Sequence, residues 1–163
     1  MSLRFAVCDD DQDYARYIES LAAHWARAAG TALEVERFPS AQAFLFRYEE
    51  RRDFDVLLLD IEMDGMDGVA LAKAVRRDND DIQIVFVTGY ADYIAQGYEV
   101  SALHYLTKPV DPDKLSQVLT RAVGRLRRNA PALTLELPGE TVRLPLSAIR
   151  YLDVSHNYVT VHA

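Results

Sequence analysis

The amino-acid sequence predicts an α/β fold, a doubly wound five-stranded parallel sheet over residues 1–128, followed by a partial all-β segment over residues 129–163. Two observations predict this. Short apolar runs alternate with amphipathic helical stretches through the first part of the chain. After Arg128 the helical pattern stops, and short strand-like runs separated by turn residues follow.

The apolar runs of the first part predict strands. Three of them are nearly continuous in apolar residues, which is typical of parallel strands that are covered on both faces. The predicted strands are Leu3–Cys8, Leu33–Phe38, Val56–Asp60, Ile82–Thr88 and Leu103–Thr107.

Amphipathic helices are predicted between these strands, because apolar residues recur there at helical spacing. Gly30 can end the first helix, and Ser40 can cap the second. The spaced residues are Tyr14, Ile18, Leu21 and Trp25 in the first helix and Leu115, Val118, Leu119, Ala122, Val123 and Leu126 in the last.

The second part begins with Asn129-Ala130-Pro131, which we interpret as a linker. The pattern that follows predicts four short strands and no helix. About thirty residues are too few to close an all-β core alone. Either this domain is truncated at Ala163 or its strands pack on the first domain. The predicted strands are Leu133–Leu137, Val142–Leu144, Ile149–Val154 and Tyr158–Val161.

Composition narrows the class of protein. The apolar runs are too short to span a membrane, and the single cysteine, Cys8, excludes a disulfide framework. These features predict a cytoplasmic protein with no membrane contact. The net charge of −7 argues against a protein that coats nucleic acid through bulk electrostatics.

Polar residues follow or end four of the predicted strands. They are Asp9 and Asp10, Asp60, Thr88, and Lys108. The carboxyl ends of parallel strands form one rim, where ligands bind, so these side chains are expected to converge. Clustered carboxylates repel one another, and a hard divalent cation relieves the repulsion. Oxygen ligands of this kind predict a Mg²⁺ site.

The same cluster predicts phosphoryl chemistry. A carboxylate at the position of Asp60 can attack a phosphoryl group, while Lys108 and a metal ion neutralise the phosphoryl oxygens. Thr88 can donate a hydrogen bond to one of those oxygens. Each residue alone is often structural, as a turn, a cap or a strand end, but their joint placement on one rim favours a functional site.

Four runs of the chain resemble the response-regulator receiver family, over about residues 3–128. The resemblance implies a flavodoxin-like receiver fold. The runs are Phe5-Ala-Val-Cys-Asp-Asp-Asp11, Asp55-Val-Leu-Leu-Leu-Asp-Ile-Glu-Met-Asp-Gly-Met-Asp-Gly68, Val85-Phe-Val-Thr-Gly89 and Tyr105-Leu-Thr-Lys-Pro109.

The resemblance also implies roles for individual residues. Asp60 is the expected phospho-acceptor, with Lys108 as the phosphate-binding lysine. Thr88 and Tyr105 are the expected switch pair. The expected Mg²⁺ ligands are Asp9, Asp10, Asp60 and the backbone carbonyl of Glu62. Asp64 stands where the family usually has proline. This departure from the family pattern does not involve any of the expected ligands.

Such a protein is a two-component response regulator rather than an enzyme, since it catalyses only its own phosphorylation and dephosphorylation. The resemblance implies a sensor histidine kinase as partner and a homodimer on phosphorylation.

A second resemblance covers Ile149–Val161, which is similar to the opening strands of a LytTR-type DNA-binding domain. His156 and Asn157 lie in a loop where that family contacts DNA, although an asparagine turn explains them equally well. DNA binding is expected of the full-length LytTR domain and not of this fragment. Residues 130–163 carry only Arg143 and Arg150 against Glu136, Glu140 and Asp153, which is a poor balance for phosphate contacts.

Two other classes of protein remain open. A Mg²⁺-dependent phosphohydrolase with an aspartyl nucleophile also uses a strand-end Asp, Thr and Lys. Such haloacid-dehalogenase-like enzymes place an Asp two residues after the nucleophile, where this chain has Glu62, and their nucleophile follows the first strand. A flavodoxin-like binding module would explain the fold but not Lys108 or the acidic pair.

Overall fold

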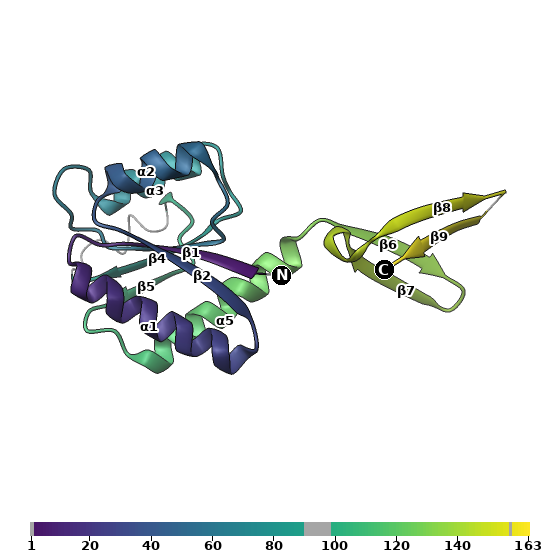
Figure 1. The fold of residues 1–163 in the computed structure, drawn as a ribbon, viewed down its shortest axis with the longest axis horizontal. Helices are drawn as coiled ribbons and strands as arrows, with labels where there is room; N and C mark the ends of the chain where they lie inside the picture. Colours follow the sequence, from purple (N-terminus) through teal and green to yellow (C-terminus); the bar gives the residue numbers. More distant parts are fainter. Residues whose placement is uncertain (1, 90–98, 157) are drawn as a thin grey trace. The chain divides into compact units, whose positions relative to one another are not determined.

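The computed structural model describes residues 2–89, 99–156 and 158–163. The first part of the chain contains a five-stranded parallel sheet with the strand order β2-β1-β3-β4-β5 (Figure 1). This confirms the predicted fold class. The strands are β1 Ser2–Cys8, β2 Ala32–Phe38, β3 Val56–Leu59, β4 Gln83–Thr88 and β5 His104–Thr107.

Helices cover both faces of the sheet, with α1 and α5 on one face and α2 and α3 on the other (Figure 1). Asp11 caps α1, which ends at Gly30 in the left-handed conformation that favours glycine. Ser40 caps α2, as predicted. The helices are α1 Gln12–Ala29, α2 Ala41–Glu50, α3 Gly68–Arg76 and α5 Pro112–Asn129.

Two apolar cores follow from the alternation of side chains along the strands. In β1, Phe5 and Val7 face the core that α1 and α5 cover, whereas Ala6 and Cys8 face the core that α2 and α3 cover. The sole tryptophan, Trp25 of α1, stacks on Phe5. Both faces of the central strands are therefore buried, which explains their continuous apolar runs.

The register aligns the carboxyl ends of the strands. Cys8 pairs with Phe38 of β2 and with Leu59 of β3, and Thr88 pairs with Thr107 of β5. The residues that follow these ends therefore emerge along one edge of the sheet.

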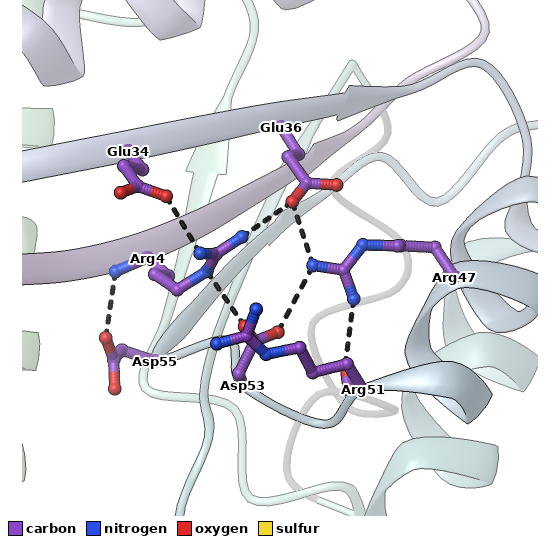
Figure 2. A network of polar contacts seen from close by, with 7 residues as sticks. All are labelled: Arg4, Glu34, Glu36, Arg47, Arg51, Asp53 and Asp55. Atoms are coloured by element: carbon purple, nitrogen blue, oxygen red, sulfur yellow. Dashed lines mark hydrogen bonds and ion pairs between the residues drawn. The ribbon is translucent and has the colours of Figure 1, made fainter.

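A network of charged side chains lies toward the opposite, amino-terminal edge (Figure 2). Arg4 of β1 contacts Glu34 and Glu36 of β2 at 2.8 Å and Asp53 at 3.1 Å. Arg47 of α2 shares Glu36 and Asp53 with Arg4. The network therefore joins two strands, one helix and the segment that leads into β3.

The chain divides into two compact units, Met1–Leu126 and Arg127–Ala163. The second unit contains two antiparallel pairs, β6 with β7 and β8 with β9. Its elements are β6 Ala132–Leu137, β7 Glu140–Pro145, the short 3₁₀ helix η2 Leu146–Ala148, β8 Tyr151–Ser155 and β9 Tyr158–His162.

The second unit departs from the sequence prediction at two places. Asn129, predicted as linker, is the last residue of α5. Arg127 and Arg128 in that last turn suit the negative end of the helix dipole, which favours the longer helix. The prediction of no helix is wrong for one turn, because the chain after Pro145 forms η2. No helix among the described residues has the length and apolarity needed to cross a bilayer.

Candidate functional site

Asp9 and Asp60 lie side by side where β1 and β3 end. The backbone amide of Asp60 donates to the carbonyl of Cys8 at 2.9 Å, and that of Asp9 donates to Phe38 at 3.1 Å. These bonds continue the hydrogen-bond ladder of the sheet by one residue, so the sheet fixes the backbone positions from which the two side chains extend. Asp9 is 3% exposed and Asp60 is 7% exposed. Two buried carboxylates thus share one edge of the sheet, as the sequence predicts.

Asp10 completes a cluster of three carboxylates. One oxygen of Asp9, one of Asp10 and one of Asp60 all lie within 4.8 Å of one another. Asp10 is exposed, so the cluster is open to solvent on that side. Hard oxygen donors at this spacing, with one open side for water, fit the way proteins hold Mg²⁺.

Lys108 reaches the cluster from the end of β5. Its backbone amide donates to the carbonyl of Thr88 at 2.9 Å. Its ammonium nitrogen Nζ donates to Oδ2 of Asp9 at 2.7 Å and to Oδ2 of Asp60 at 3.2 Å. One ammonium group does not balance three carboxylates, so the site retains an excess of negative charge.

Burial and the neighbouring charges shift the pKa values of three groups at this edge. Burial raises the pKa of Asp9 to about 6, although the hydrogen bond from Lys108 lowers it. Burial alone would lower the pKa of Lys108, but its hydrogen bond to Asp9 and the charge of Asp60 raise it. Burial, and then the charge of Asp9, raises the pKa of the Cys8 thiol to about 12. Cys8 is therefore a neutral, buried thiol, while Lys108 stays charged.

Thr88 and Tyr105 lie on adjacent strands near the same edge. Thr88 is fully buried, and among the described residues its hydroxyl oxygen Oγ1 has no hydrogen-bond partner. A buried hydroxyl without a partner is costly, so Thr88 has a hydrogen bond to offer to a group that enters the site. Tyr105 is half-buried, and its ring packs on Phe86 with the centroids 6.4 Å apart.

Glu62 borders a hollow of about 260 Å³ beside the carboxylate cluster. Its side chain is exposed. The hollow is lined by Asp10, Ile61, Glu62, Met63, Asp64 and Asp67.

Gly68 holds the loop after Asp60 against the sheet. Its amide donates to the carbonyl of Ile61 at 2.8 Å. A Cβ atom at this position would lie 2.0 Å from the carbonyl oxygen of Asp60. Only glycine permits this approach, because no L side chain fits against backbone at that distance.

The predicted DNA-contact residues lie in the second unit. His156 is exposed and has a positive φ of 53°, which places it in the turn that joins β8 and β9. Asn157 lies outside the described residues.

Residues 5–120 match the family of response regulator receiver domains. The chain belongs to this family. The match contains every strand from β2 to β5 and every residue of the carboxylate cluster. It ends within α5, before the second compact unit begins. A receiver domain is a signalling module rather than a conventional enzyme.

Solved receiver domains share the fold of this one. The receiver domain protein from Clostridium thermocellum has a TM-score of 0.68 and 22% identity, covering 77% of this chain and 98% of that one. The response regulatory domain of MrkE from Klebsiella pneumoniae has a TM-score of 0.69 and 18% identity, covering 78% of this chain and all of that one (100%). At these identities the likeness shows the fold.

Curated relatives of this receiver are longer proteins. The DNA-binding transcriptional regulator NtrC of Salmonella typhimurium is 29% identical over 150 residues, covering 91% of this chain and 30% of that protein. Sensory transduction protein LytT of Bacillus subtilis is 39% identical over 67 residues, covering 41% of this chain and 28% of that protein. The chain therefore spans less than a third of these relatives.

Two residues of the site were not assigned a role from the sequence. Gly68 appears there only as the end of a motif, and Tyr14 appears only as a core-facing position of the first helix. The structure places Gly68 against the Asp60 carbonyl and the Tyr14 ring beside Lys108. The sequence pattern gives no signal for either contact, because both depend on how the loop after β3 and the start of α1 pack in three dimensions.

Proposed function

We propose that this receiver domain accepts a phosphoryl group on Asp60 from a histidine kinase, and that the modification controls a DNA-binding output. The observation that carries the proposal is the grouping at one sheet edge of three carboxylates, Asp9, Asp10 and Asp60, with Lys108, whose ammonium group contacts Asp9 and Asp60.

The chemistry follows from the side chains. A carboxylate oxygen of Asp60 forms a bond to phosphorus, and the bond from phosphorus to the donor breaks with its electron pair leaving on the donor. Lys108, which stays charged, neutralises a phosphoryl oxygen. Thr88 supplies a buried hydroxyl that can donate to another oxygen. A Mg²⁺ ion held by Asp9, Asp10, Asp60 and the Glu62 carbonyl would supply further positive charge.

The test is incubation of the protein with acetyl phosphate and Mg²⁺, followed by intact-mass spectrometry. One labile phosphoryl adduct per chain is the expected result. Incubation with a generic phosphatase substrate in parallel separates the alternatives. Steady turnover of that substrate would favour the aspartyl-nucleophile phosphohydrolase, and neither adduct nor turnover would favour a binding module.

Binding of Mg²⁺ is expected to depend on pH because the pKa of Asp9 is raised to about 6. Below that pH the carboxyl group carries a proton that a cation must displace, so affinity falls as pH falls through about 6. The expected loss approaches about tenfold per pH unit. Isothermal titration calorimetry with Mg²⁺ on either side of this pKa measures it.

The control for this prediction is Asp9→Asn, which cannot ionise. This variant should bind Mg²⁺ weakly and with a much flatter pH dependence. A wild-type affinity for Mg²⁺ that is the same above and below about pH 6 would show that Asp9 is not the ligand that titrates.

The switch that we propose pairs Thr88 with Tyr105. Phosphorylation would draw the Thr88 hydroxyl toward a phosphoryl oxygen, and Tyr105 on the neighbouring strand would move into the space released. The support is the unsatisfied hydroxyl of Thr88 and its burial. We further propose that this change promotes a homodimer, which sedimentation with beryllofluoride would detect.

The proposed output is a LytTR-type domain that begins in residues 129–163. The support within this unit is its two short antiparallel strand pairs. The chain is also similar over 67 residues to sensory transduction protein LytT. His156 and Asn157 would contact DNA within the full-length domain. This chain carries a net charge of −7, so a gel shift with it should show no specific binding. A cytoplasmic location is part of the proposal, since the only cysteine is a buried thiol.

A further inference from the structure

Tyr14 of α1 makes two contacts with the segment that carries Lys108. Its ring centroid lies 4.5 Å from the ammonium nitrogen of Lys108. Its hydroxyl accepts a hydrogen bond from the backbone amide of Val110 at 2.9 Å. Tyr14 therefore touches both the charged tip of Lys108 and the backbone two residues beyond it.

We propose that Tyr14 is a positioning residue for Lys108, which holds the ammonium group over the phospho-acceptor edge. The inference rests on the proposed function, because the position of Lys108 matters only if Asp60 is phosphorylated. At this distance the face of an aromatic ring attracts a cation. The ring therefore acts through Lys108 and does not itself touch the reacting atoms.

The contact with Tyr14 matters because the other described partners of Lys108 are the proposed phospho-acceptor, Asp60, and a proposed metal ligand, Asp9. In the resting site the ammonium is held by Asp9 and Asp60. A cation bound at Asp9, or a phosphoryl group on Asp60, would take up the oxygens that now accept from Lys108. A lysine side chain is long and flexible, so loss of these partners frees it to move. The ring of Tyr14 is uncharged and does not react, so it can hold Lys108 throughout.

The hydroxyl contact has a separate effect. Val110 lies in the loop that joins β5 to α5, and its side chain is buried. Its amide is tied to the first turn of α1 through Tyr14. The ring and the hydroxyl therefore act on different atoms, and substitutions can separate them.

Tyr17 offers a matched control on the same helix. It lies one turn after Tyr14, is 41% exposed, and its ring meets that of Tyr14 edge-on with the centroids 5.7 Å apart. No contact between Tyr17 and Lys108 is found among the described residues. Tyr17→Leu therefore removes an aromatic ring of equal size without touching the lysine.

The experiment measures the rate of phosphorylation at saturating Mg²⁺ and sub-saturating acetyl phosphate, followed by intact mass. Tyr14→Leu is expected to lower the rate constant about three- to tenfold, the range expected of a cation–π contact. Tyr14→Phe keeps the ring and should stay within about twofold of wild type, and Tyr17→Leu should match wild type. Thermal melts and Mg²⁺ titrations verify that each variant is folded with an intact carboxylate cluster.

A double-mutant cycle distinguishes positioning from a general structural effect. In a Lys108→Ala background, Tyr14→Leu should have no further effect on the rate. An equal loss in both backgrounds would overturn the proposal, as would a Tyr14→Phe rate as low as that of Tyr14→Leu. A wild-type rate in Tyr14→Leu would overturn it as well. If the wild-type protein accepts no phosphoryl group, the proposed function is wrong, and this outcome is distinct from a failure of the role proposed for Tyr14.

Discussion

Asp60→Asn is expected to abolish formation of the phosphoryl adduct with acetyl phosphate and Mg²⁺. The amide is nearly the same size as the carboxyl group, so the fold should persist, but its oxygen is a poor nucleophile toward phosphorus. The substitution also removes one negative charge from a cluster of three carboxylates, two of which are buried. The variant should therefore melt at the same or a higher temperature than wild type.

Asp80→Asn is the matched control for this substitution. Asp80 is exposed and precedes β4, at the end of the sheet opposite to Asp60. Its variant should accept one phosphoryl group at the wild-type rate. An adduct of undiminished yield in Asp60→Asn would assign the acceptor to another residue, and peptide mapping of that adduct would identify it.

Gly68→Ala is expected to lower the free energy of unfolding by about 3 kcal/mol or more, at the upper end of overpacking effects. The added Cβ would lie 2.0 Å from the carbonyl oxygen of Asp60 and 2.9 Å from Cα of Ile61. Both neighbours are backbone atoms, so neither can move aside without shifting the loop after β3. Urea unfolding followed by circular dichroism measures the loss.

Gly89→Ala tests whether this cost is specific to the close approach. Among the described residues, no heavy atom lies within 4 Å of a Cβ built on Gly89, and its φ is not positive. This substitution should change stability by less than about 1 kcal/mol. Equal stability of Gly68→Ala and wild type would contradict the close approach of Gly68 to Asp60.

The sequence predicted the strands and the residues that meet at their ends, for a physical reason. A parallel strand covered on both faces must be a continuous apolar run, so a polar residue such as Asp9 or Asp60 marks where the run ends. The carboxyl ends of parallel strands lie together at one edge. Lys108 directly follows the fifth strand, so it was predicted to lie at that edge as well. Spacing and polarity alone therefore predicted which side chains converge.

The contacts within the site could not be predicted in the same way. Lys108 lies closer to Asp9 than to Asp60, which depends on rotamers and on the path of the loop after β5. The ring of Tyr14 appeared in the sequence as one apolar position of an amphipathic helix. A helical pattern gives the side of the helix that is buried, but it does not say which residue at the helix start meets another loop.

The charge network around Arg4 has a consequence for how this domain tolerates change. Ion pairs gather toward the amino-terminal edge of the sheet, while at the other edge three carboxylates share the single ammonium group of Lys108. The two ends of the same strands therefore differ in how well their charges are balanced. Substitution of Asp9, Asp10 or Asp60 is expected to leave the contacts of Arg4 in place, because the two groups of side chains share no partner.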